Sequence, residues 1–355
     1  MKKILFIQPK SYYDALGVDI DNSFFEATYG IFFSFNIRKE LMCFDVIVNC
    51  LDHDLSARKI CRMANELNIP TMYLMDGIFE SNNAVNNWAF KSRNISQFDE
   101  KIYDIILTPT GEHMDYLRSH GVSASIFYPK RIYFDVDNSM SKEFDFIITT
   151  ANTPYFDEPE FQKLTSIIEK TYHEIIKLNY SVIFRIFDNR LLNELSNRNI
   201  NVINIVDCDI SKAINKCRCL ITTMSSIIIP CVNQQYPVIM IRHRDYNECD
   251  LDVRNVVDLN TSLNNLDDII IKSIEMSKNT NWFSSSKDIG FKFSKDFINS
   301  RQNLFNKSTF VPTKYGFSIY ISFSYVIRYV YKKYNLYFIK RYIKWLVHEK
   351  NSSHN

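Results

Sequence analysis

Hydrophobic residues in this chain gather in short runs rich in isoleucine and valine, and longer stretches of helical periodicity separate these runs. In the first 130 residues the runs predict strands at 4–8, 46–49, 71–75, 105–109 and 125–127. Apolar residues recur every three or four positions over 56–67 and 112–120, which predicts helices there. Nearly continuous apolar strands separated by helices are typical of a parallel sheet that is covered on both faces.

A second alternation of the same kind begins at residue 144. It predicts strands at 144–149, 182–186, 202–206, 219–222 and 238–241, with helices at 158–178, 226–233 and 263–277. We therefore expect an α/β fold with two Rossmann-like domains facing a central cleft. The N-terminal domain would span 1–130, a linker 131–143, and the C-terminal domain 144–297. The linker is placed where a proline, scattered charges and the run Asp-Val-Asp-Asn-Ser break the alternation.

The last 58 residues, 298–355, differ in composition from the rest. Residues 298–348 contain no aspartate or glutamate, while nine lysines and arginines alternate with many aromatic residues. Such a segment predicts a basic amphipathic helix that lies on an anionic membrane surface, where each base contributes about 1 kcal/mol. The alternative is a helical tail that packs back on the first domain with its bases in solvent.

Composition limits the classes of protein that remain. A chain of 355 residues with 46% hydrophobic and 23% charged residues suits two globular domains. A formal charge of +2 argues against nucleic acid as a partner. The eight cysteines form no CxxC pair, and neither a signal peptide nor a run of 18 apolar residues is present. We therefore expect a reduced cytoplasmic protein, peripheral on the cytoplasmic face of the membrane if the tail docks there.

Small hydroxyl residues follow a strand in each half, at 105–113 and at 219–227. A strand end that leads into a helix is a common anion site, because free backbone N–H groups and the helix dipole point towards the ligand. We predict a phosphate or diphosphate at the second stretch, held without a metal by Thr222, Thr223, Ser225 and Ser226. The alternative is that these serines only cap the helix.

Other polar residues are predicted at the same edge of the second sheet. The loop after 144–149 offers Thr150 and Asn152 to a nucleotide or phosphate. Arg185, His243 and Arg244 follow two further strands and add positive charge, and arginine is a natural partner of phosphate. The alternative for each arginine is a surface ion pair.

Candidate catalytic residues follow the strands of the first half. Asp76 and Glu80 come after the strand 71–75, with Gly77 allowing a tight turn, and either carboxylate could act as a general base or nucleophile. His113 could transfer a proton or bind phosphate. The alternatives are a turn aspartate, a helix-capping glutamate and a solvated histidine. No metal-binding motif is evident, and Asp207 and Asp209 are predicted to cap a helix rather than hold a metal.

These blocks resemble GT-B-type glycosyltransferases of bacterial surface polysaccharide biosynthesis, such as those of capsule or O-antigen. The resemblance rests on the segments 103–110 and 148–154 and on the block from Asp209 to Ile241. It implies transfer of a sugar from a nucleotide sugar to a lipid-linked or growing glycan acceptor, with the donor on the second half. It implies no cofactor and no metal. The glutamate common in the donor block of retaining members is absent, since Cys231-Val-Asn-Gln occupies that region, so retaining and inverting chemistry both stay open.

Two other functional interpretations fit the same residues. One is a nucleotide-sugar epimerase or a phosphopolyol transferase on the same fold, and an epimerase differs in needing no acceptor. The other is a non-catalytic, membrane-docked module of a polysaccharide assembly complex.

Overall fold

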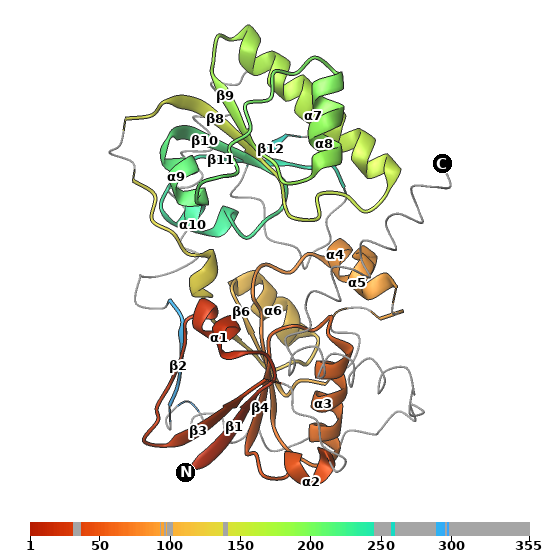
Figure 1. Ribbon diagram of the computed structural model, residues 1–355, viewed down its shortest axis with the longest axis vertical. Helices are drawn as coiled ribbons and strands as arrows, with labels where there is room; N and C mark the ends of the chain where they lie inside the picture. The colour runs from red at the N-terminus through yellow and green to blue at the C-terminus, as the bar shows by residue number, and fades with distance from the viewer. Residues whose placement is uncertain are drawn as a thin grey trace.

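A computed structural model describes residues 1–30, 37–92, 94, 95, 97, 102–137, 141–244, 257–259, 289–294 and 297, of which 85, 89 and 257–259 are described by backbone alone. The described chain forms two halves, each built on a parallel sheet, stacked along the long axis of the molecule (Figure 1). The first sheet has the order β3-β1-β4-β5-β6-β7. Its strands are β1 (Lys2–Phe6), β3 (Phe25–Tyr29), β4 (Val46–Asn49), β5 (Thr71–Leu74), β6 (Ile105–Thr108) and β7 (Ala124–Ile126).

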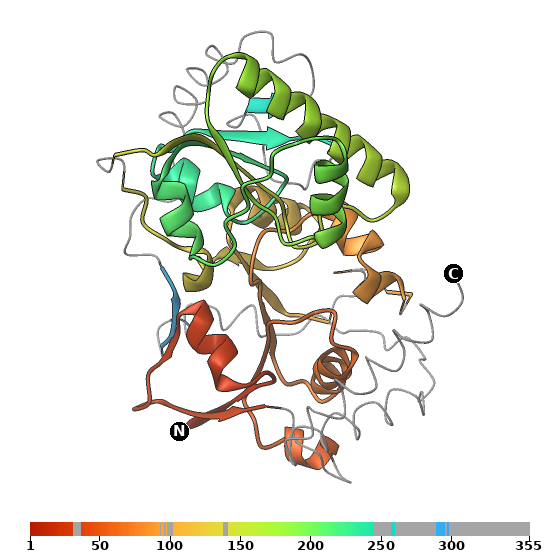
Figure 2. The ribbon, with the colours of Figure 1, turned by 45° about the horizontal axis from the view of Figure 1, so that its top comes forward.

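The second sheet has the order β12-β11-β10-β8-β9, and every ladder in it is parallel. Its strands are β8 (Phe144–Thr149), β9 (Val182–Arg185), β10 (Cys217–Thr222), β11 (Val238–Ile241) and β12 (Val257–Leu259). Two parallel sheets that each alternate with helices confirm the predicted α/β class with two Rossmann-like halves. Figure 2 shows the two halves from a tilted direction, with the segment between β7 and β8 joining them.

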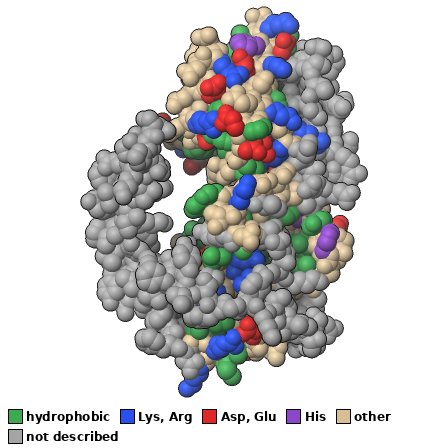
Figure 3. Space-filling model, turned by 90° about the vertical axis from the view of Figure 1, so that its right-hand side faces the viewer, with side chains coloured by type: hydrophobic (Ala, Val, Ile, Leu, Met, Phe, Trp, Pro, Cys, Tyr) green, Lys and Arg blue, Asp and Glu red, His purple; other side chains and the backbone are tan. Residues whose placement is uncertain are grey.

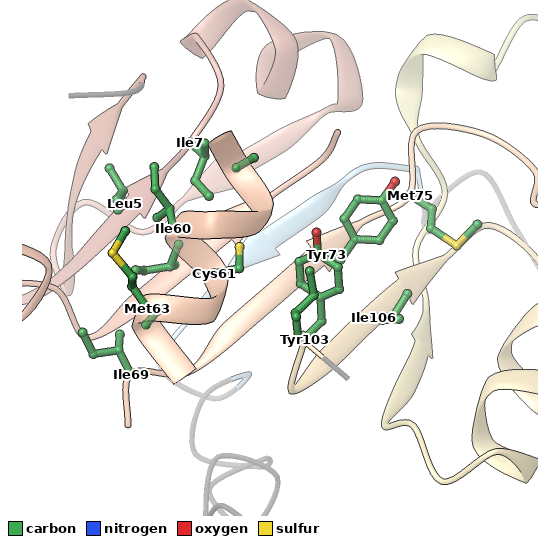
Figure 4. Close-up of a cluster of buried hydrophobic side chains, with 14 of the residues drawn as sticks. Leu5, Ile7, Ile60, Cys61, Met63, Ile69, Tyr73, Met75, Tyr103 and Ile106 are labelled. Carbon is green, nitrogen blue, oxygen red and sulfur yellow. The ribbon is translucent and has the colours of Figure 1, made fainter. Parts of the chain in front are cut away.

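Helix α3 (Leu55–Glu66) covers one face of the first sheet. The Asp54 carboxylate caps it by accepting a hydrogen bond from Ser56 N, and the chain leaves the helix through Asn68, whose φ is 60°. Ile60 and Cys61 are buried against Leu5 of β1 and Ile7 just after it, in the same cluster as the stacked rings of Tyr73 and Tyr103 (Figure 4). The opposite face is covered by α1 (Lys10–Leu16), whose Tyr13 and Leu16 are buried on Phe6.

Helix α7 (Glu158–Lys177) covers the second sheet on one face. Asp157 caps its N-terminus by accepting from Glu160 N, and a proline stands in its first turn. Phe161, Leu164, Ile168 and Ile175 form its buried stripe, at the spacing expected of a helix on a core. The other face carries the short helices α9 (Ile210–Asn215) and α10 (Ile228–Asn233).

Two predicted elements are wrong in detail. The segment 202–206 forms one isolated bridge, between Asn204 and Phe184, instead of a strand. The Asn204 side chain takes the place of the ladder there: its Oδ1 accepts from Ile186 N at 2.9 Å and its Nδ2 donates to Ile186 O at 3.0 Å. The helix predicted from 226 begins at Ile228, so Ser225 and Ser226 lie in the turn before it.

The chain returns to the first half earlier than predicted. Strand β13 (Phe291–Phe293) pairs in parallel with β2 (Val18–Ile20), and Phe293 is buried against Phe6 and Phe25. Figure 1 shows β13, in blue, beside β2. The boundary predicted at residue 297 is therefore too late. The predicted helix 263–277 and the tail 298–355 lie outside the described residues.

Several short elements were not predicted from the sequence. They are α2 (Ile37–Leu41), α4 (Ser81–Asn86), α5 (Trp88–Lys91), the 3₁₀ turn η1 (Lys130–Ile132) and α8 (Asn189–Asn197), in addition to α1, β2 and β3. Helix α6 (Gly111–Ser119) was predicted within one residue at each end. Within the described residues, no helix combines the length and apolar character needed to cross a membrane.

The outer face of the second half carries charges of both signs. Figure 3 shows basic and acidic side chains intermingled over this half, on the side where α7 and α8 lie. Many of them are paired: Arg198 contacts Glu169 and Glu194, and Arg190 contacts Glu158. Among the described residues, this face therefore presents no block of a single charge.

Candidate functional site

The loop that follows β5 reaches across to the second half. Ile78 N donates a hydrogen bond to Ser226 Oγ at 3.0 Å, although the two residues are 148 positions apart. A Cβ at Gly77 would lie 2.6 Å from the same Ser226 oxygen, so a side chain there would displace this oxygen and break its hydrogen bond with Ile78 N. The structure thus brings the predicted carboxylate loop, 76–80, against the predicted phosphate turn, 222–226.

Glu80 and Arg244 form a second contact between the halves. Arg244 Nη1 lies 3.0 Å from Glu80 Oε1, and Arg244 Nη2 lies 3.5 Å from Glu160 Oε2. The side chains of Arg244 and Glu80 are only 4% and 12% exposed. The guanidinium also stacks over the Phe156 ring at 4.3 Å and donates to Pro154 O. Arg244 was predicted to neutralise a phosphate and Glu80 to act in catalysis, but here each side chain neutralises the other.

His243 lies beside this ion pair, where Arg244 Nε donates to its Nε2 at 3.1 Å. Burial, with help from the Arg244 charge, lowers the pKa of His243 to about 4. A neutral imidazole that is 2% exposed supports the position of Arg244 and adds no positive charge to a phosphate site.

Asp76 lies beside a different arginine. Arg131 Nη1, from η1, lies 2.9 Å from Asp76 Oδ2, and the two side chains are 43% and 39% exposed. Both groups therefore remain open to solvent and to a ligand. Arg131 fell in the predicted linker and was not considered as a site residue, yet it brings a positive charge close to the Gly77–Ser226 contact.

A pocket of about 330 Å³ opens in the first half beside Asp76. It lies at the carboxyl ends of β4 and β5, where ligands bind in open parallel sheets. Its wall is made by the β4–α3 connection, the end of β5 with the loop after it, and the pair α4 and α5. The lining residues are Cys50, Leu51, Asp52, His53, Tyr73, Met75, Asp76, Gly77, Ile78, Asn83, Asn87, Phe90 and Gln97.

A series of buried polar side chains, joined by hydrogen bonds, lies beneath this pocket. Gln8 Nε2 donates to Asn49 Oδ1 at 2.7 Å, Asn49 Nδ2 donates to Tyr103 Oη at 2.6 Å, and Tyr103 Oη donates to Asp52 Oδ1 at 2.6 Å. The other oxygen of Asp52 pairs with Arg58 Nη1 at 2.6 Å, and both of these side chains are nearly inaccessible. Buried polar groups whose hydrogen bonds are satisfied make a structure rigid. These contacts therefore hold the β4–α3 connection, which carries His53, in place.

The remaining donor-side residues lie at the carboxyl ends of β8, β9 and β10. Thr223 Oγ1 accepts from Ala151 N at 2.8 Å, which ties the 222–226 turn to the loop that carries Thr150 and Asn152. Thr222 and Thr150 are buried, whereas Ser225 is half-buried and Asn152 is exposed. Arg185 is in register with Thr149 and Thr222, two strands from the turn and about 10 Å away at the usual strand spacing. Its guanidinium donates to Ile205 O and stacks on Phe187.

His113 does not line this pocket. Its side chain is buried in the first half with its ring edge-on to Phe79, and its backbone N donates to Thr110 Oγ1 at the start of α6. Burial lowers the pKa of His113 to about 4. A neutral, enclosed imidazole suits packing, and the catalytic role predicted for His113 lacks access to a substrate in this arrangement.

No cluster of three or more metal-ligating side chains occurs among the described residues. Asp209 stands at the N-terminus of α9, as predicted, but its side chain makes no capping hydrogen bond.

No family model matches the sequence, and no curated protein matches it. Solved structures do match over most of the chain. The S. aureus MnaA–UDP co-structure has a TM-score of 0.56 at 13% identity, covering 89% of this chain and 100% of that one. UDP-GlcNAc 2-epimerase from Neisseria meningitidis bound to UDP-GlcNAc gives 0.56 at 12% identity, covering 85% and 100%. At such identities the likeness shows the fold alone, and the predicted GT-B-like fold is confirmed.

The pocket and the role of Arg131 beside it were not predicted from the sequence. The pocket could have been predicted, because residues 50–53 directly follow the predicted strand 46–49, just as Asp76 follows the strand 71–75. Ligands of open parallel sheets bind at such strand ends. Nothing in the sequence indicated that η1 would carry Arg131 back to Asp76, because that contact depends on how the two halves are joined.

Proposed function

We propose that this protein is an enzyme that transfers a sugar from a nucleotide sugar to a hydroxyl group of an acceptor, in the cleft between its two halves. The observation that carries this proposal is the hydrogen bond from Ile78 N to Ser226 Oγ. It joins a pocket that contains a carboxylate, on the first half, to a turn of small hydroxyl residues at a strand end, on the second. Two adjacent binding regions, one on each half, suit a reaction with two substrates.

On the donor side, the turn 222–226 and Arg131 would hold the diphosphate. The turn offers hydroxyl groups at the carboxyl end of β10, and Arg131 is a half-exposed guanidinium that can exchange Asp76 for a phosphate. Arg244 is excluded from this role while Glu80 and Glu160 surround it. Because the two similar structures hold UDP and UDP-GlcNAc, uridine nucleotides are the first to test.

On the acceptor side, the 330 Å³ pocket would hold the receiving sugar. Its amide side chains, Asn83, Asn87 and Gln97, provide donors and acceptors for hydroxyl groups, and Phe90 adds an apolar surface. A lipid-linked or growing glycan of a bacterial surface polysaccharide is the acceptor that we propose. Docking of residues 298–355 on the membrane surface would bring the enzyme to that acceptor.

Epimerisation of a nucleotide sugar is the second candidate. The observation that favours it is the likeness to the N. meningitidis UDP-GlcNAc 2-epimerase, whose full length is covered by 85% of this chain at the same TM-score as MnaA. An epimerase would need no acceptor, and the pocket would then hold the sugar of the nucleotide sugar itself.

Product analysis separates the two reactions. The purified protein is incubated with UDP-GlcNAc, with and without a mixture of glycan acceptors, and the products are identified by chromatography and NMR. Transfer predicts release of UDP that depends on the acceptor, and a new glycoside. A changed sugar on UDP without any acceptor would instead establish epimerisation. Substitution of both Ser226→Ala and Arg131→Ala should weaken either reaction, whereas Lys216→Ala, at an exposed pair with Glu143, should weaken neither.

A further inference from the structure

The pocket contains five titratable side chains, and their surroundings differ sharply. Cys50 and Tyr73 stay protonated at neutral pH, because burial raises the pKa of Cys50 to about 12 and that of Tyr73 well above its ordinary value. Asp52 is fully engaged, with one oxygen on Arg58 and the other on Tyr103. Asp76 is paired with Arg131.

His53 is the fifth, and its side chain is exposed to the pocket. Within the described part of the chain, no group hydrogen bonds to its ring nitrogens, and its one ring neighbour is Phe90, edge-on at a centroid distance of 6.2 Å. The two histidines predicted as site residues, His113 and His243, are both buried. Histidine is the side chain that most often transfers protons in enzymes, because its neutral ring carries a nitrogen that accepts a proton.

We propose that His53 is the general base that takes the proton from the acceptor hydroxyl, an inference that rests on the proposed transfer reaction. As a ring nitrogen of His53 accepts the hydroxyl proton, the electron pair of that oxygen forms the new bond to the anomeric carbon of the donor sugar. The bond between this carbon and the phosphate oxygen breaks, and its electron pair leaves with the nucleoside diphosphate. His53 then releases the proton to water.

The buried polar chain beneath the pocket holds the segment that carries His53. Asp52, its neighbour in sequence, cannot move without losing its contacts with Arg58 and Tyr103, and Tyr103 is in turn held by Asn49. Asp76 lies across the same pocket, where its carboxylate can orient the acceptor or stabilise positive charge that develops on the donor sugar.

The test compares His53→Gln with His173→Gln, an exposed histidine on α7 of the second half. UDP release from UDP-GlcNAc is measured with and without acceptor from pH 5 to 9, and UDP affinity is measured separately. Loss of a general base predicts that acceptor-dependent release falls on the order of 10²- to 10⁴-fold in His53→Gln, while UDP affinity is unchanged. The fall in wild-type rate at acidic pH should disappear in this variant and persist in His173→Gln.

Two different results would contradict the role of His53 and the transfer reaction. If His53→Gln keeps acceptor-dependent release within about threefold of wild type, with the acidic limb intact, His53 is not the base and transfer still stands. If the wild-type protein itself shows no acceptor-dependent release, the transfer reaction and the role of His53 are both overturned.

Discussion

Arg244 and Glu80 are 164 residues apart in the chain and form a 3.0 Å ion pair across the boundary between the two halves. The pair is almost enclosed, and Glu160 and Phe156 complete its surroundings from the second half. Together with the hydrogen bond from Ile78 to Ser226, it fixes the loop after β5 against the second sheet. The relative position of the pocket and the 222–226 turn therefore depends on these two contacts.

Removal of one partner from this pair should be costly. Arg244→Ala takes the guanidinium away from the half-buried carboxylates of Glu80 and Glu160, and we expect a loss of about 3–5 kcal/mol in the free energy of unfolding. Urea unfolding followed by circular dichroism measures it. Lys216→Ala, which removes an exposed pair with Glu143, should cost less than about 1 kcal/mol. Equal losses in the free energy of unfolding for the two substitutions would show that the Arg244–Glu80 pair stabilises the protein no more than an exposed pair does.

Gly77 offers a direct probe of the contact between loop and turn. In Gly77→Ala the new methyl group would meet Ser226 Oγ at 2.6 Å, and relief of the overlap should cost about 1–3 kcal/mol. The Ser226 Cβ lies 3.8 Å from the same point, which is an ordinary contact, so Ser226→Ala should restore part of the lost stability. Thermal unfolding of the single and double variants tests this. If Ser226→Ala adds its own loss to that of Gly77→Ala, the two residues are not in contact in solution.

Much of the fold follows from local pattern. Strands such as β8 and β11 were predicted at their observed bounds, and α7 within one residue, because buried runs and a regular apolar stripe are local properties of the sequence. The failures have local causes too. The segment around Asn204 has the composition of a strand, but a side-chain amide replaced the ladder, and β2 was too short and too polar to stand out.

The candidate site was less predictable, because it depends on contacts between distant parts of the chain. Asp76 and Ser226 could be singled out, since each follows a strand end. That Arg244 would face Glu80 rather than a phosphate, and that His113 would be enclosed, depends on how the halves meet and how α6 packs. Nothing in the sequence near residue 113 distinguishes a buried histidine from an exposed one.

The buried state of His113 predicts a dependence of stability on pH. Its pKa is about 4 in the folded protein against an ordinary value of 6.5, so the unfolded chain binds more protons between these limits. The contribution is present in full above pH 6.5 and is lost as the pH falls towards 4, on the order of 3 kcal/mol in all.

His113→Leu should therefore make the stability of the protein less sensitive to acid between pH 6.5 and 4, with stability at pH 7.5 retained. Midpoints of urea unfolding across this range give the comparison, and His120→Gln, at the exposed end of α6, is the matched control. An unchanged acid sensitivity in His113→Leu would mean that the imidazole is accessible to protons in the folded protein. Loss of enzymatic activity in a stable His113→Leu protein would restore the catalytic role predicted from the sequence.

Binding of a nucleotide in the cleft is the claim on which the rest depends, and thermal unfolding measures it most directly. The wild-type protein is heated with UDP, GDP, CMP, dTDP or CDP in the presence of EDTA. A ligand at 100 times its dissociation constant that binds only the folded state adds about 2.7 kcal/mol. We expect one nucleotide, UDP first among them, to raise the midpoint without a metal, and the Ser226→Ala/Arg131→Ala protein to lose that shift. No shift with any of the five at millimolar concentration, or an equal shift in the double variant, would contradict the proposed site.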